Sequence, residues 1–222
     1  RLLSSSSTLN GGTPAVVQHE YDAVGRLKTN KYKTGATFLA ETMTYNARGW
    51  LTSKTSTPFT MTLRYETTAL GASGKKYYNG DISEWEWKNG TTAPVMYALS
   101  YDGLNRLSGS VHYQGGTAWT ALAGNNAYDE KGLTYDRNGN ILTLTRTGVS
   151  ASTLAYTYTG NRLTGLTKNG VTGTYSHDPN GNMINDSRKS LNFEYNILNL
   201  LAVVKTGTTL KASYTYLADG TK

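Results

Sequence analysis

Apolar and polar residues alternate over short stretches of the chain, and several of these stretches end in a tyrosine. Before Tyr101, the residues at two-residue spacing are Leu99, Tyr97 and Val95. Side chains two residues apart in a β-strand lie on the same face, so the alternation predicts a half-buried strand. The same pattern precedes Tyr65, Tyr158 and Tyr195. Since no stretch shows a helical period, the chain is predicted to be all-β, built from antiparallel hairpins.

A turn motif follows most of these tyrosines, and its clearest copy is Tyr21-Asp22-Ala23-Val24-Gly25-Arg26-Leu27. Asp or Asn at the first position of a β-turn caps the turn, and Gly at the fourth position accepts a positive φ. The unit predicts a type I turn followed by a left-handed residue, which closes a bulged hairpin. The residues assigned to this structural motif are Tyr21, Asp22, Gly25, Tyr45, Asn46, Gly49, Tyr101, Asp102, Tyr135, Asp136, Gly139, Asp178 and Gly181.

The motif recurs at intervals of roughly twenty to thirty-five residues, the period of stacked supersecondary units. A single hairpin cannot bury its apolar face alone, so each is expected to pack on its neighbours. The sequence predicts one repeat domain over residues 15–222. Residues 1–14 are expected to be a linker or a frayed edge, and the chain is expected to be an internal segment of a larger protein.

The distribution of the charged residues bears on whether the chain binds nucleic acid. The formal net charge is +7, but Lys and Arg are spread at one or two per repeat, which argues against nucleic-acid binding. Arg26, Arg106 and Arg162 occupy the same position after the turn. Such a repeated position predicts a structural role, in which the arginine lies across a neighbouring tyrosine ring or pairs with a turn carboxylate.

The chain contains no cysteine, which excludes disulfides, thiolate metal sites and thiol nucleophiles. It also has no apolar run long enough to span a membrane. His19, His112 and His177 are isolated from other metal-ligand residues, so no metal or cofactor is expected. His177 stands where other copies of the motif have tyrosine, and it is expected to take the packing role of that tyrosine.

The recurring Tyr-Asp-x-x-Gly-Arg-Leu resembles the YD repeat of the Rhs family, in the version found in large secreted proteins of Bacteroidetes. This resemblance covers residues 20–222. It implies a β-ribbon that spirals into a hollow shell, as in Rhs proteins, the C subunits of insecticidal Tc toxins and the teneurins. It also implies a secreted or cell-surface bacterial protein whose partners are the remainder of the parent chain and an encapsulated C-terminal toxin domain. The family's self-cleavage core is not encoded here, because the only Asp-Pro is Asp178-Pro179 in an ordinary turn.

One carboxylate pair has the spacing of a glycosidase site. Glu84 and Glu86 would share one face of a strand, with Trp85 and Trp87 on the other. Ordinary alternation, with charges in water and tryptophans packed, explains the same pattern, and we favour it. The sequence also lacks a Gly-x-Ser-x-Gly nucleophile motif, so an enzyme is not expected.

The tryptophans leave a second hypothesis open. Trp50, Trp85, Trp87 and Trp119 are expected to pack between hairpins, but exposed aromatic rings on a sheet also stack on sugars. Trp119 lies in the least repeat-like stretch and is expected to be the most exposed. The preferred function is therefore a structural wall segment. The alternative is a carbohydrate- or protein-binding adhesion module on the bacterial surface, with Trp119, Trp85 and Trp87 contacting the glycan.

Overall fold

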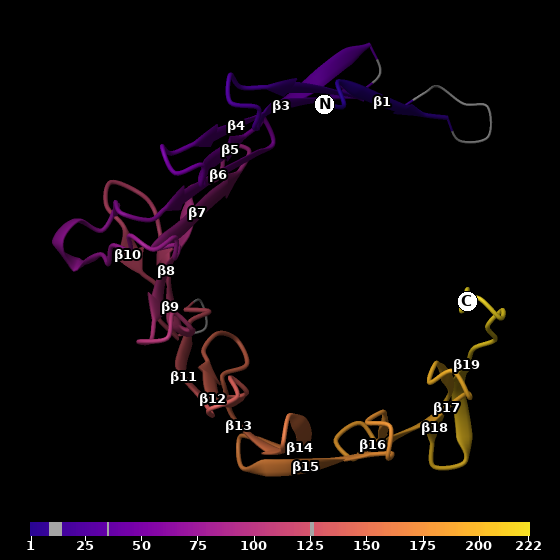
Figure 1. Cartoon of the computed structure of the whole chain (residues 1–222). Coiled ribbons are helices and arrows are strands. Elements are labelled where there is room, and N and C mark those ends of the chain that lie inside the picture. Colours follow the sequence, from indigo (N-terminus) through magenta and orange to yellow (C-terminus); the bar gives the residue numbers. More distant parts are fainter. Residues whose placement is uncertain (9–14, 35, 125–126) are drawn as a thin grey trace. The chain divides into compact units, whose positions relative to one another are not determined.

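The computed structural model describes residues 1–8, 15–34, 36–124 and 127–222. They form two compact units, Arg1–Asp129 and Glu130–Lys222. The regular structure in these ranges consists of nineteen β-strands and one short 3-10 helix, which confirms the predicted all-β class. In Figure 1 the strands of each unit follow one another in chain order, as expected for consecutive hairpins.

The first unit contains ten of these strands. They are β1 (Ser4–Ser7), β2 (Ala15–Tyr21), β3 (Leu27–Thr34), β4 (Thr37–Tyr45), β5 (Leu51–Thr55), β6 (Phe59–Arg64), β7 (Glu84–Asn89), β8 (Val95–Tyr101), β9 (Leu107–Gln114) and β10 (Thr120–Ala121). The 3-10 helix η1 (Gly71–Ser73) lies between β6 and β7. Each strand pairs antiparallel with the next strand along the chain.

The second unit repeats the same arrangement. Its strands are β11 (Glu130–Tyr135), β12 (Ile141–Arg146), β13 (Ser152–Thr159), β14 (Arg162–Lys168), β15 (Val171–His177), β16 (Met183–Asp186), β17 (Leu191–Tyr195), β18 (Leu201–Thr206) and β19 (Thr209–Ser213). Consecutive strands again pair antiparallel.

Part of the N-terminal stretch, which the sequence predicts to be a linker or a frayed edge, is paired in the sheet. Ser4–Ser7 pairs with β2 in the register Ser4↔Gln18 to Ser7↔Ala15, so these serines form an edge strand. Their side chains are exposed, and the backbone pairing holds the strand in place. Residues 9–14, the rest of the expected linker, lie outside the described residues.

The turns have the geometry that the Asp-x-x-Gly spacing predicts. The Gly25 amide donates to the carbonyl oxygen of Asp22 over 2.9 Å, and the Asp22 amide donates to the carbonyl oxygen of Arg26 over 2.9 Å. Gly25 has φ of +90°, and the β2–β3 register shifts between Glu20 and Tyr21, which marks the bulge. The other assigned glycines, Gly49, Gly139 and Gly181, have φ of +82°, +86° and +92°.

Two looser copies of the motif use asparagine at the left-handed position. Asn105 has φ of +60° in the turn after Tyr101, and Asn199 has φ of +57° in the turn after Tyr195. Asparagine tolerates this conformation better than other non-glycine residues because its short polar side chain bonds locally. The loose copies therefore keep the conformation of the turn while changing the residue.

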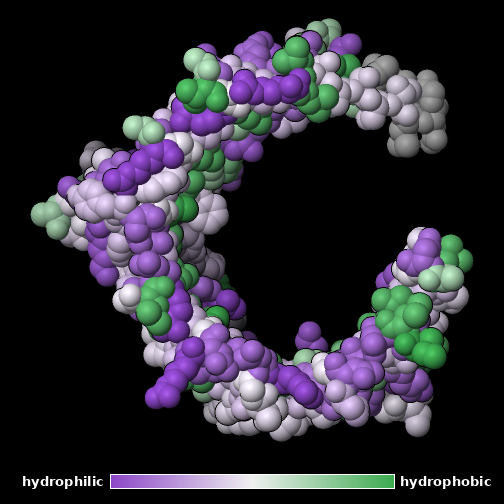
Figure 2. Space-filling model, in the orientation of Figure 1, coloured by the Kyte–Doolittle hydropathy of each residue, from purple (hydrophilic) through white to green (hydrophobic). Residues whose placement is uncertain are grey.

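The hydrophobic core is thin. Among the described residues, the buried apolar side chains are Tyr65, Met96, Ala127, Leu133 and Leu144, and of these only Met96 is fully buried. Most other strand residues are half-buried, and Figure 2 shows a largely hydrophilic or neutral visible surface with hydrophobic residues in small scattered groups. With so little deep burial, the contacts from each hairpin to its neighbour carry much of the stability.

We predict that Gly139→Ala lowers the unfolding free energy by about 1–2 kcal/mol, because alanine is strained at positive φ. A Cβ at residue 139 would meet no atom within 4 Å, so the cost comes from the backbone alone. Gly103→Ala is the matched control, because it too has open space but no positive φ. Chemical denaturation measures both variants. Equal stability of the two would contradict the left-handed turn.

Candidate functional site

The most regular side-chain contact among the described residues joins a tyrosine at or just after the end of a strand to the hairpin before it. The Tyr45 hydroxyl donates to the carbonyl oxygen of Leu27 over 2.7 Å, and Leu27 is the first residue after the preceding turn. In the described part of the chain, the equivalent bond also joins Tyr21 to Leu2, Tyr65 to Leu51, Tyr101 to Ile82, Tyr158 to Ile141, Tyr195 to Met183 and Tyr216 to Leu201. The donor–acceptor distances in this set are 2.7–3.0 Å. The contact fixes how each hairpin sits on its predecessor.

The turn aspartate and the arginine after it extend this contact. Arg26 Nε lies 2.7 Å from Asp22 Oδ2, and its guanidinium carbon lies 4.7 Å from the centroid of the Tyr45 ring. Both roles expected for this arginine are therefore present together. Arg106 also pairs with its turn carboxylate, Asp102, at 2.7 Å.

Asparagine caps the turn as aspartate does. Asn46 Oδ1 accepts hydrogen bonds from the amides of Arg48, over 3.0 Å, and Trp50, over 2.9 Å. The same two amide contacts form at Asp136 and Asp178 with the turn residues that follow them. The side-chain oxygen, rather than the charge, is thus the common requirement of the turn.

The ionisation of the motif residues suits this structural role. The backbone amide of Arg106, followed by its guanidinium, holds the pKa of Asp102 below its ordinary value of 3.8. The side-chain amides of Asn140 and Asn182 lower the pKa of Asp136 and Asp178 in the same way. Burial raises the pKa of Tyr101 to about 12, so its hydroxyl keeps the proton that it donates to Ile82.

The carboxylate pair Glu84 and Glu86 is bound by a single arginine. Arg64 Nη2 lies 2.6 Å from Glu86 Oε2, and Arg64 Nη1 lies 3.4 Å from Glu84 Oε2. Glu84 also accepts hydrogen bonds from the Thr68 hydroxyl and from the Ala69 amide, the latter over 2.7 Å. These partners saturate Glu84 and make it a structural anchor for the segment 66–83 that precedes β7.

The exposure that the sequence predicts for the carboxylates and tryptophans of β7 is wrong. Glu84 is 1% exposed, whereas Trp85 is 41% exposed, the reverse of charges in water and tryptophans packed. The segment 66–83 covers the Glu84 side of β7 and supplies its hydrogen-bond donors, so Trp85 on the opposite face is left in contact with solvent.

Five aromatic side chains lie together across β7, β8, β9 and the residue Tyr128, and we call this set the aromatic face. Its members are Trp85, Trp87, Tyr97, His112 and Tyr128, with neighbouring ring centroids 5.0–6.5 Å apart. The strand register places Trp85 opposite Tyr97 and Tyr97 opposite His112. Because Trp85 and Tyr128 are 41% and 47% exposed, the face presents rings to solvent.

Trp119, expected to be the most exposed tryptophan, is half-buried instead. A Cβ added at Gly115 would come within 3.0 Å of its ring, so the ring packs against this glycine. Trp50 packs on Tyr65, with ring centroids 5.0 Å apart, as expected for a tryptophan between hairpins. Trp85 therefore replaces Trp119 as the leading candidate for ligand contact.

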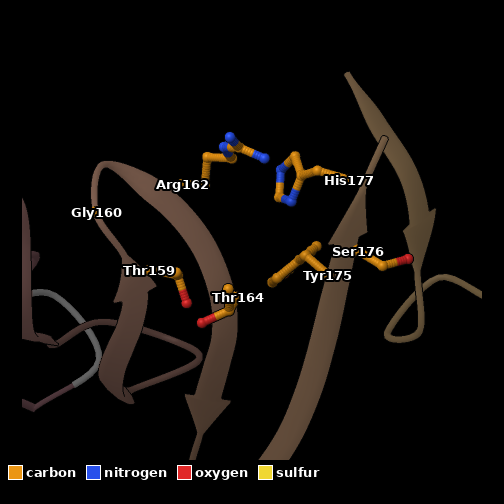
Figure 3. Close-up of a pocket in the computed structure, with 7 residues that line it drawn as sticks. All are labelled: Thr159, Gly160, Arg162, Thr164, Tyr175, Ser176 and His177. Carbon is orange, nitrogen blue, oxygen red and sulfur yellow. The ribbon is translucent and has the colours of Figure 1, made fainter. Parts of the chain in front are cut away.

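The remaining histidines have separate environments. His19 Nδ1 lies 2.7 Å from Asn30 Oδ1. His177 lines an open groove of about 470 Å³ together with Arg162 and Tyr175 (Figure 3). Within the described residues, no group of three or more His, Asp or Glu side chains is placed to hold a metal ion.

The described part of the chain contains no helix with the length and apolar character needed to cross a membrane.

No protein-family model and no curated protein matches the chain. Among solved structures, the chain is similar to one in the crystal structure of TcdB2-TccC3-TEV, with a TM-score of 0.62 and 14% identity over 98% of this chain. A chain in the crystal structure of TcdB2-TccC3 aligns with a TM-score of 0.43 and 13% identity over 96% of this chain. The first alignment shows a shared fold and supports the Rhs-like fold expected from the repeat. The 222 residues span only 13% of the chain they match there.

We predict that the protein loses stability as the pH falls below about 4. The pKa values of Asp102, Asp136 and Asp178 are lowered in the folded state, so their contribution is present above the ordinary value of 3.8. It is lost as the pH falls through the folded-state values. Replacing all three with asparagine, which already caps the turn at Asn46, should flatten this dependence. Thermal unfolding followed by circular dichroism between about pH 7 and about pH 2 measures it.

The control for that experiment is Asp81→Asn, which lies outside the Asp-x-x-Gly turns and should leave the acid slope unchanged. An undiminished slope in the triple variant would show that other carboxylates govern acid unfolding.

Proposed function

We propose that the chain is a non-catalytic structural segment of a large bacterial Rhs-type protein, secreted or displayed at the cell surface. In this proposal it contributes wall to a β-shell that encloses or delivers a C-terminal toxin domain. The shared fold with the TcdB2-TccC3-TEV chain supports the Rhs-type assignment, and the small fraction of that chain covered here supports a segment of a longer protein.

The repeated tyrosine contact is the observation that carries the proposal. Each hydroxyl reaches the carbonyl oxygen of the hairpin before it, as Tyr158 reaches Ile141 and Tyr195 reaches Met183. A contact that needs only the preceding hairpin can be added again and again, which is how a wall grows from one chain. Each contact engages the tyrosine hydroxyl and a backbone carbonyl oxygen in a hydrogen bond, which suits a structural role.

The strand at the C-terminal end of the second unit fits the same account. Among the described residues, β19 pairs antiparallel with β18, from Val203↔Ser213 to Thr206↔Thr209. Tyr216, which follows β19, already bonds back to Leu201 over 2.9 Å. The last described hairpin is therefore built like the internal ones.

The non-catalytic part of the proposal draws on the carboxylates and histidines. Glu84 and Glu86 share Arg64 in place of facing a sugar-sized space. His19 is bonded to Asn30, and His112 lies within the aromatic face. These environments support the non-catalytic proposal, because these side chains are engaged in ion pairs, hydrogen bonds or ring packing.

Limited proteolysis of the full-length gene product tests the enclosing role. We expect the region that follows the repeats to resist cleavage while the repeats are folded. Tyr195→Ala should speed that cleavage several-fold, because the alanine removes both the ring and the bond to Met183. Tyr78→Ala is the matched control, because Tyr78 is 64% exposed. Cleavage of that region as fast as when it is produced alone would refute the proposal.

The aromatic face supports a second function, binding of a carbohydrate or protein by a surface-displayed module. Trp85 and Trp87 lie with ring centroids 5.1 Å apart, and Trp87 stacks on Tyr97 at 5.6 Å. Trp87 also lines a groove of about 380 Å³ with Lys88 and Gln114. Exposed rings beside polar side chains are the combination that sugar recognition uses, through stacking on the apolar face of a pyranose.

A glycan array followed by tryptophan fluorescence titration tests this second function. If it is correct, Trp85→Ala weakens binding of any retained glycan about tenfold or more, since the stacking contact of the exposed ring is lost. Trp50→Ala is the control, because the Trp50 ring packs on Tyr65 outside the aromatic face, and it should leave the affinity unchanged. Absence of glycan binding, or equal effects of the two variants, would leave the wall segment as the sole proposal.

A further inference from the structure

The hairpin that ends at His177 departs from the repeated contact. By position, Leu163 follows Arg162 as Leu27 follows Arg26, so the Leu163 carbonyl stands where a motif tyrosine hydroxyl would bind. Histidine is shorter than tyrosine and carries no hydroxyl. Among the described residues, no side-chain hydrogen bond joins His177 to the preceding hairpin, and the space at this position opens into the groove of about 470 Å³.

The arginine of the preceding turn departs from the pattern as well. Arg26 and Arg106 pair with the turn aspartates Asp22 and Asp102. In the copy that begins at Tyr158, threonine takes the place of that aspartate, so Arg162 has no turn carboxylate. Within the described residues Arg162 forms no ion pair, and its side chain is exposed.

The acidic residues near this groove are bound within their own turns. The sequence from residue 147 to residue 177 contains Arg162 and Lys168 but no Asp or Glu. The next acid, Asp178, accepts hydrogen bonds from the Asn182 amide and side chain, both over 2.9 Å. Asp186 likewise accepts the amides of residues 188 and 189. The neighbouring carboxylates are therefore occupied within their own turns.

Figure 3 shows how the groove residues converge. The Arg162 side chain on β14 extends toward the imidazole of His177 on β15, and Thr159 and Thr164 lie below them. The Ser176 side chain points to the other side of β15, as strand alternation requires. A guanidinium, an imidazole and hydroxyl groups thus border one open space.

We propose that this groove is an anion-binding site, in which Arg162 and His177 hold an oxyanion such as the sulfate, phosphate or carboxylate group of a ligand. The planar guanidinium binds such groups through two parallel hydrogen bonds, and an imidazole N–H adds a third donor. The site lies on the second unit and does not depend on the wall or adhesion function. It arises where two substitutions in the repeat, histidine for tyrosine and threonine for aspartate, fall on neighbouring hairpins.

Histidine-selective NMR of the 222-residue chain tests the proposal, because the chain has only three histidines. Sodium sulfate and sodium phosphate are titrated separately at constant ionic strength, which is maintained with sodium chloride. We expect the His177 ring resonances to shift in a saturable manner with at least one of the two anions. His19, bonded to Asn30, and His112, in the aromatic face, serve as internal controls and should stay in place.

Variants separate a built site from general salt effects. Arg162→Gln should weaken the anion about tenfold or more, since it removes a charge-assisted contact. Lys168→Gln removes an equal charge from the same strand outside the groove and should retain the wild-type affinity. Equal shifts of all three histidines, no shift of His177, or unchanged binding by Arg162→Gln would overturn the proposal.

A second variant tests the origin of the groove. His177→Tyr restores the motif residue, so its hydroxyl is expected to reach Leu163 and its ring to fill the groove. Calorimetric titration with the same anion should then show no binding, and the melting temperature should rise. Anion binding by His177→Tyr at wild-type affinity would show that the groove does not arise from the missing tyrosine.

Discussion

A β-hairpin with one apolar face has nothing within itself to cover that face, and the regular contacts between hairpins in this chain provide the cover. The tyrosine at the end of one strand places its ring against the preceding hairpin and its hydroxyl on a carbonyl oxygen there. The ring buries apolar surface, but packing of a ring is not strongly directional. The hydrogen bond is directional, so it fixes the distance and orientation between the two hairpins. Tyr45 and Leu27 show the arrangement with its arginine in place.

The turn residues position the backbone for this contact. A left-handed residue and a side-chain cap return the strand so that the first residue after the turn presents its carbonyl to the next tyrosine. Asp22 and Asn46 perform the same capping, and of the two only Asp22 also forms an ion pair with an arginine. A charged residue is therefore not required to cap the turn. Where aspartate is present, as at Asp22, its carboxylate pairs with Arg26, and the guanidinium of Arg26 lies over the Tyr45 ring of the following hairpin.

Sequence reasoning succeeded where the determinants are local. The strands, the turns and the left-handed glycines at Gly25 and Gly139 depend on residues within one hairpin, so spacing alone predicted them. Burial of Glu84 and exposure of Trp85 depend on the segment 66–83 folding over one side of β7, and strand alternation carries no sign of that.

The aromatic face shows the same limit. It requires the register of three strands, so the two-residue spacing of Trp85 and Trp87 was visible in sequence but their alignment with Tyr97 and His112 was not. For the groove, the two substituted positions could be read from the motif. The opening they leave, however, depends on how two hairpins pack.

The segment 66–83 shows that the repeat accommodates a long connection between two paired strands. Tyr65 bonds back to Leu51 before the segment begins, and Tyr101 bonds back to Ile82 at its end, so the contacts on both sides are intact. The β6–β7 register runs without a shift from Phe59↔Asn89 to Arg64↔Glu84. The long connection therefore leaves the pairing of β6 with β7 unchanged. A foreign peptide grafted near Gly71–Ser73 would be displayed without altering the strands that carry it, which makes this loop a natural point for engineering new surface chemistry.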